Sequence, residues 1–114
     1  KPGSRSVCVN WKDADGNFWL FGGAGLDATG NDSCLNDLWK FDGTNWTWVS
    51  GDNTINQVGV YGTKGITADT NKPGSRYGSV GWTDASGSFL LLGGYGYGDP
   101  AVYGRFNDLW RFEP

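Results

Sequence analysis

Short hydrophobic runs, bounded by Gly, Asp and Asn, follow one another along the whole chain. In 36–42 (NDLWKFD) and 45–50 (NWTWVS), neighbouring positions alternate with the period of two that is typical of a half-buried strand. The runs at 5–11 and 17–23 are rich in β-branched and aromatic residues, which favour strands. No window carries the 3.6-residue period of an amphipathic helix. The pattern predicts an all-β protein with strands over 5–11, 17–23, 36–42, 45–50, 76–82, 88–94 and 107–113.

The pattern occurs twice, at a fixed distance of 71 positions: the sequence KPGSR stands at 1–5 and again at 72–76. Aligning 1–43 with 72–114 without a gap gives 20 identical positions out of 43. Such a repeat indicates an architecture of packed, equivalent units. We therefore expect a first unit at 1–51, a connector at 52–72, and a partial second unit at 73–114 without the counterpart of the strand at 45–50.

Several signatures keep the register of the repeat: the pairs Gly22–Gly23 and Gly93–Gly94, Arg5 and Arg76 at strand starts, the Asn-Asp-Leu-Trp sequences that end at Trp39 and Trp110, and the alternating Trp46 and Trp48. They resemble the kelch-repeat family, in particular the long blades of secreted bacterial proteins and of galactose-oxidase-like central domains. The resemblance implies kelch-type β-propeller blades, one complete four-stranded blade plus three strands of a second. It also implies that these residues are structural.

Physical reasoning gives these residues the same structural roles. We expect each glycine pair to end a strand where backbones approach closely. We expect Arg5 and Arg76 to bind backbone carbonyls or an Asp of an adjoining blade rather than an anionic ligand. The tryptophans are packing residues before they are ligand platforms.

The candidate binding residues are Tyr95, Tyr97, Tyr103 and Arg105. Because a meander sends alternate connections to opposite ends, we expect 24–35, 51–73 and 95–106 to be long loops at one end of the units. Tyr rings suit stacking on sugars or contact with a partner protein, and Arg can bind a carboxylate or vicinal hydroxyls with its fork. The alternative is that the rings only cover their own loop.

Composition excludes several functions. The chain has no His, which excludes a Ser-His-Asp triad and His-ligated metal within this segment. A net charge of −3 makes nucleic acid and anionic membranes poor partners. Asp37 and Asp108 suggest a carboxylate pair for hydrolysis, but they are equivalent positions of two units, which favours the same local hydrogen bonds made twice. We predict no metal and no cofactor.

Three further motifs have simpler explanations. Residues 23–28 match a dinucleotide fingerprint, but no helix pattern follows them. Residues 13–17 imitate the start of a calcium loop, but the later acidic ligands are missing, which favours a hairpin turn. Cys8 and Cys34 can form one disulfide if the protein is secreted, or remain two free thiols.

These observations predict a non-catalytic extracellular module, secreted or periplasmic, that acts in binding and assembly. Its partners would be other blades, from copies of this chain or from a longer one, and a glycan or protein at the long-loop end. One alternative is a fragment of a propeller enzyme such as a galactose-oxidase-like carbohydrate oxidase. Another is a designed or evolved blade fragment without a ligand.

Overall fold

The computed structural model describes residues 1–98 and 100–114, which form two antiparallel β-sheets. Sheet 1 contains β1 (Arg5–Ser6), β2 (Val9–Lys12), β3 (Phe18–Leu26), β4 (Asp32–Phe41) and β5 (Trp46–Ser50). Sheet 2 contains β6 (Arg76–Tyr77), β7 (Val80–Thr83), β8 (Phe89–Tyr97) and β9 (Tyr103–Phe112). The prediction of an all-β chain is confirmed. In the described part of the chain, no helix is long and apolar enough to cross a membrane.

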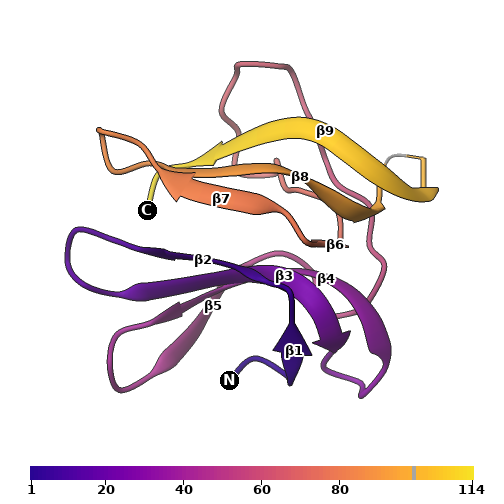
Figure 1. Ribbon diagram of the computed structural model, residues 1–114, viewed down its shortest axis with the longest axis horizontal. Coiled ribbons are helices and arrows are strands. Elements are labelled where there is room, and N and C mark those ends of the chain that lie inside the picture. Colours follow the sequence, from indigo (N-terminus) through magenta and orange to yellow (C-terminus); the bar gives the residue numbers. More distant parts are fainter. Residues whose placement is uncertain (99) are drawn as a thin grey trace.

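The two sheets have the same layout and lie one above the other (Figure 1). In sheet 1, β1 and β2 pair with β3, which pairs with β4, and β4 pairs with β5. In sheet 2, β6 and β7 pair with β8, which pairs with β9. A connector over 51–75 joins the sheets, and its backbone carries one isolated bridge, between Val60 and Lys72.

The first predicted strand of each unit is divided in the structure. The run 5–11 becomes β1 and β2, because Val7 has a φ of 55° that interrupts extended pairing. In the second unit Gly78 takes the equivalent place, with a φ of 71°. In the first unit hydrophobic residues continue through the break at Val7, so the sequence does not reveal it.

The expectation that the glycine pairs end a strand is wrong. Gly22 and Gly23 have φ of 61° and 101°, and the register shifts between Phe21 and Gly23. This is a β-bulge, which bends a strand without ending it. The same bulge occurs at Gly93 and Gly94, and in both sheets the extra residue lies on the partner strand, β4 or β9. Strand β3 therefore runs on to Leu26, and β8 runs on to Tyr97.

The bulges also correct the prediction of long loops over 24–35 and 95–106. Most of each segment is paired, since β4 begins at Asp32 and β9 begins at Tyr103. Among the described residues, only 27–31, 98 and 100–102 of the two segments lie outside the strands, and residue 99 of the predicted loop lies outside the described residues. The hairpin tips lie at one end of the molecule and the short turns between β2 and β3 and between β7 and β8 at the other (Figure 1). The connector remains irregular over most of its length, as expected.

The hydrophobic core lies between the sheets. We call face A the side of sheet 1 that points inward and carries five buried residues: Val9, Trp11, Trp19, Phe21 and Leu38. We call face B the side of sheet 2 that points inward, which carries Phe89, Leu91, Trp110 and Phe112. Trp11 stacks on Phe89 across the interface, with ring centroids 5.2 Å apart. Face A of one unit therefore packs on face B of the next.

Candidate functional site

The four candidate binding residues lie on one surface of sheet 2, on paired strands rather than on loops. Tyr95 of β8 is opposite Arg105 of β9, and Tyr97 is opposite Tyr103. Residues two apart on a strand share a face, so all four side chains lie on the same side. This is the side that points away from sheet 1, because it alternates with the inward Phe106 and Asp108.

A fifth residue, Tyr77 of β6, belongs to this group and was missed by the sequence analysis. It lies opposite Tyr95, and the two rings stack with centroids 5.7 Å apart. Tyr77 and Tyr103 share a hydrogen bond of 2.5 Å between their hydroxyls. The rings of Tyr97 and Tyr103 lie 5.6 Å apart. We call these five residues the tyrosine cluster: Tyr77, Tyr95, Tyr97, Tyr103 and Arg105.

The repeat contains a signal that could have found Tyr77. At the five equivalent positions the first unit has Ser6, Ala24, Leu26, Asp32 and Cys34. None of these is aromatic, so the tyrosines appear where the two units differ. Their position on one surface became visible only with the strand register, because β8 was expected to end at Gly94.

The cluster is an aromatic surface in which Arg105 supplies the one charge. The Arg105 Nε donates to the Tyr95 hydroxyl at 3.2 Å, and this hydrogen bond raises the pKa of Arg105. The hydrogen bond with Tyr77 is the main cause that raises the pKa of Tyr103 to about 12, so its hydroxyl remains protonated at neutral pH. Half of Tyr103 and 38% of Tyr95 are exposed. These rings cover one another in part and remain accessible.

Each sheet is locked by a buried arginine and a carboxylate. The two Arg5 amino groups donate to the two Asp37 oxygens at 2.5 and 2.8 Å. Arg5 also donates to the carbonyls of Gly3 and Gly22, and the Trp39 Nε1 donates to Asp37 at 2.7 Å. The expected carbonyl contacts are confirmed. The expected Asp of an adjoining blade is wrong, because this Asp belongs to the same sheet.

Sheet 2 repeats the lock with the equivalent residues. Arg76 donates to Asp108 at 2.7 and 3.0 Å and to the carbonyls of Gly74 and Gly93, and Trp110 donates to Asp108 at 2.8 Å. Burial raises the pKa of Asp108, but the hydrogen bonds from Arg76 and Trp110 outweigh it and lower the pKa. Both carboxylates therefore make structural contacts within their own sheet.

The remaining candidates are turn and packing residues. Asp13 accepts the backbone N–H groups of Asp15 and Asn17 and the Trp19 Nε1, which makes it the centre of a hairpin turn. Within 1–98 and 100–114, no three His, Cys, Asp or Glu side chains are grouped to hold a metal ion. Trp46 packs on Phe41 and Trp48 is nearly half exposed on the outer side of sheet 1.

Cys8 and Cys34 are both free thiols. Cys8 lies beside Gly23 on one edge of β3, and Cys34 pairs with Ala24 on the other edge. Two strand spacings separate them, about 9–10 Å, which is too far for a disulfide without backbone movement.

In comparisons with known proteins, the sequence matches no protein-family model and no curated protein.

Proposed function

We propose that this chain is a non-catalytic, extracellular pair of kelch-type β-propeller blades that binds glycans through the tyrosine cluster. The observation that carries the binding function is the gathering of four Tyr rings and one Arg on one accessible surface of sheet 2. Aromatic rings pack against the apolar faces of sugars, and an Arg fork can bind sugar carboxylates or vicinal hydroxyls.

The propeller assignment is supported by the way in which the two units are built and packed. Each is a meander with the same strand order, and each has the same Arg–Asp–Trp lock. The units stack face to face, as blades do around a common axis. Further blades would complete such a ring.

We propose that the chain is not catalytic because its two candidate carboxylates, Asp37 and Asp108, are already used in structural hydrogen bonds. Asp37 accepts three hydrogen bonds from Arg5 and Trp39, and Asp108 accepts three from Arg76 and Trp110 and one from the Tyr61 hydroxyl. They belong to different sheets and make the same contacts twice. These hydrogen bonds hold the strands together, and a substrate that approached either carboxylate would have to displace them.

The expected binding is weak. An aromatic contact contributes about 0.5–1.5 kcal/mol beyond burial, so the four rings together support a dissociation constant on the order of a millimolar. Multivalent display on a surface would increase the avidity. Weak single sites are therefore compatible with a function in adhesion to polysaccharide.

The test is an array of neutral and acidic glycans probed with the chain displayed at high density. We expect the triple substitution of Tyr95, Tyr97 and Tyr103 by Ala to abolish binding, and Arg105→Gln to weaken binding of acidic glycans at least tenfold. Trp48→Ala is the matched control, because it removes an equally exposed ring from another surface. Equal binding by the triple variant and the wild type would overturn the proposal, as would a wild type that binds no glycan on the array.

A further inference from the structure

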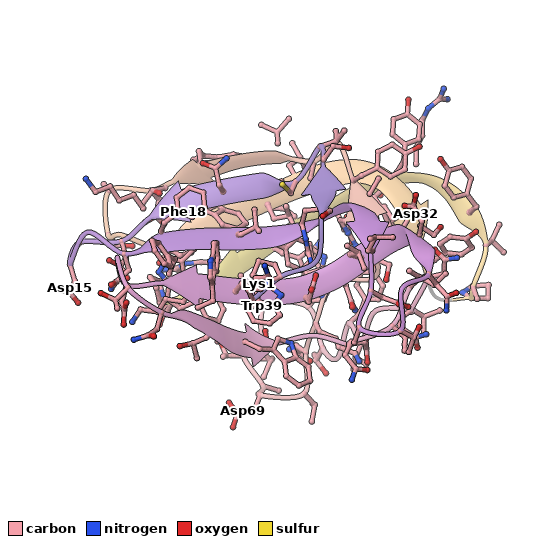
Figure 2. All side chains as sticks on the ribbon, turned by 90° about the horizontal axis from the view of Figure 1, so that it is seen from below. Lys1, Asp15, Phe18, Asp32, Trp39 and Asp69 are labelled. Atoms are coloured by element: carbon pink, nitrogen blue, oxygen red, sulfur yellow. The ribbon has the colours of Figure 1, made fainter. Side chains whose placement is uncertain are left out.

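The outer side of each sheet carries an apolar patch. Figure 2 looks onto the outer side of sheet 1, where Phe18 and Trp39 are labelled. By strand alternation, this side also carries Leu20 and Phe41. The outer side of sheet 2 carries five hydrophobic residues, of which Val80 and Leu109 are about 60% exposed: Val80, Trp82, Leu90, Leu92 and Leu109.

These two surfaces are the unpaired counterparts of the surfaces that form the core. The five outer residues of sheet 2 are the equivalents, 71 positions on, of Val9, Trp11, Trp19, Phe21 and Leu38, which form face A. In sheet 1 this set is buried, with Val9 and Leu38 each 7% exposed. The outer residues of sheet 1 are likewise the equivalents of face B. The chain therefore presents an open face A on sheet 2 and an open face B on sheet 1.

The interface between the two sheets also includes a polar contact, and the same contact can form between two chains. The Asn36 side chain donates to the Pro73 carbonyl at 3.1 Å, and Ser75 and Arg76 of the same KPGSR sequence are fully buried. The first KPGSR sequence, at 1–5, is more exposed, and Asn107, the equivalent of Asn36, is also exposed. Asn107 can therefore bind the Pro2 carbonyl of a second chain as Asn36 binds Pro73.

We propose that a second copy of this chain docks its face B and its KPGSR sequence at 1–5 on the open face A of sheet 2. The occupant is identified by the internal interface, since face B has the same four residues in both sheets and face A has the same residue at three of five positions, with Leu90 and Leu92 in place of Trp19 and Phe21. This inference rests on the assembly part of the proposed function and not on the glycan site. In sheet 1 the equivalents of Tyr77, Tyr97 and Tyr103 are exposed, so docking leaves these three rings accessible, whereas the equivalents of Tyr95 and Arg105 are half-buried and buried.

One position opposes an exact copy of the internal contact. Gly81 faces Val9 and Trp11, and a Cβ at Gly81 would lie too close to Val9. The equivalent residue on the open face B is Asn10. Docking between chains must displace the Val80 side chain or shift the sheets slightly at this point, which weakens it relative to the internal contact.

The test uses two variants that each disable one face. Leu109→Glu places a charge on the open face A, and Phe18→Glu places one on the open face B; both positions are exposed, so the fold should tolerate the change. We expect the wild type to show a mass in light scattering that rises with concentration, while each variant alone remains a monomer. An equimolar mixture should form one-to-one pairs, because only one intact face A and one intact face B remain.

Asn10→Gly should strengthen the association about tenfold, whereas the exposed Val102→Ala, at a hairpin tip, should not change it. A wild type that is monomeric at millimolar concentration overturns the inference, as does a mixture of the two variants that stays monomeric. Association that survives both single substitutions shows that another surface is used, and also overturns it. Glycan binding that persists in monomeric variants would leave the proposed binding function intact.

Discussion

Trp11 and Phe89 come from different units, and their rings stack across the interface at an interplanar angle of 6°. Trp11 also donates its Nε1–H to the Leu90 carbonyl at 3.2 Å, so a single side chain makes an apolar and a polar contact with sheet 2. Truncation of Trp11 therefore tests the packing of one unit on the other more directly than any other substitution.

We predict that Trp11→Ala lowers the free energy of unfolding by about 3–5 kcal/mol, the usual cost of removing a large buried aromatic. The matched control is Trp82→Ala, which removes the equivalent ring from the open side of sheet 2 and should cost less than about 1 kcal/mol in a monomeric sample. Urea unfolding of both variants measures the difference. Equal losses would contradict the inside–outside assignment of the two rings.

Trp39→Ala and Trp110→Ala test the role of the lock geometry that is repeated in the two units. Both rings are half-buried and each donates to its Asp, so both substitutions should destabilise. Trp110 also contacts Tyr61 and the core, and its loss should cost about 3 kcal/mol, more than the loss of Trp39. Thermal unfolding with the order reversed would refute this reading.

Arg76→Lys should cost about 3 kcal/mol, because Lys keeps the charge but cannot supply the two-armed contact to Asp108 or reach both carbonyls. Arg111→Lys is the control: its side chain is about half exposed, and its distances to Asp84 and Glu113 are 3.9 and 3.3 Å. That substitution should be nearly neutral. Chemical denaturation distinguishes the two, and a neutral Arg76→Lys would show that the fork is dispensable.

Gly81→Ala should destabilise by about 1–3 kcal/mol, because the new Cβ meets the Val9 and Trp11 side chains in the core. Gly104→Ala, in β9 of the same sheet, has no atom within 4 Å of its added Cβ and should be neutral or slightly stabilising. Melting temperatures of the two variants provide the measurement. A tolerated Gly81→Ala would mean that the sheets can separate locally without cost.

The turn carboxylates predict a dependence of stability on pH. Burial raises the pKa of Asp13, but hydrogen bonds led by Trp19 outweigh it and lower the pKa to about 2. A folded pKa below the unfolded value stabilises the fold above the unfolded pKa of about 3.9, and this contribution is lost as the pH falls toward 2. Asp13→Asn should therefore flatten the decline in melting temperature between about pH 5 and pH 2. An unchanged decline would show that other groups control acid unfolding.

The sequence was sufficient for the class and the order of the strands, because alternation and the 71-position repeat constrain both. It was also sufficient to place Arg5 and Asp37 among structural residues. It failed where a backbone angle decides the outcome: Val7 and the Gly22–Gly23 pair take positive φ, and neither the division of the first strand nor the continuation through a bulge changes the hydrophobic pattern.

The tyrosine cluster was predicted only in part, because its position also depends on the continuation of β8 through the bulge. Tyr95, Tyr97, Tyr103 and Arg105 were found by composition, but they were assigned to a loop because the strand was expected to stop at Gly94. Tyr77 enters through the pairing of β6 with β8, a contact between distant positions that a local pattern does not contain.

The difference between face A and face B gives any association of this chain a direction. A contact that joins unlike surfaces does not saturate when two chains meet, because every open stack still has one free face A at one end and one free face B at the other. If the rotation from one sheet to the next divides a full turn evenly, growth stops in a closed ring; otherwise the same contact continues into a filament. The angle between two sheets within a single chain therefore sets the size of the particle that many chains would build.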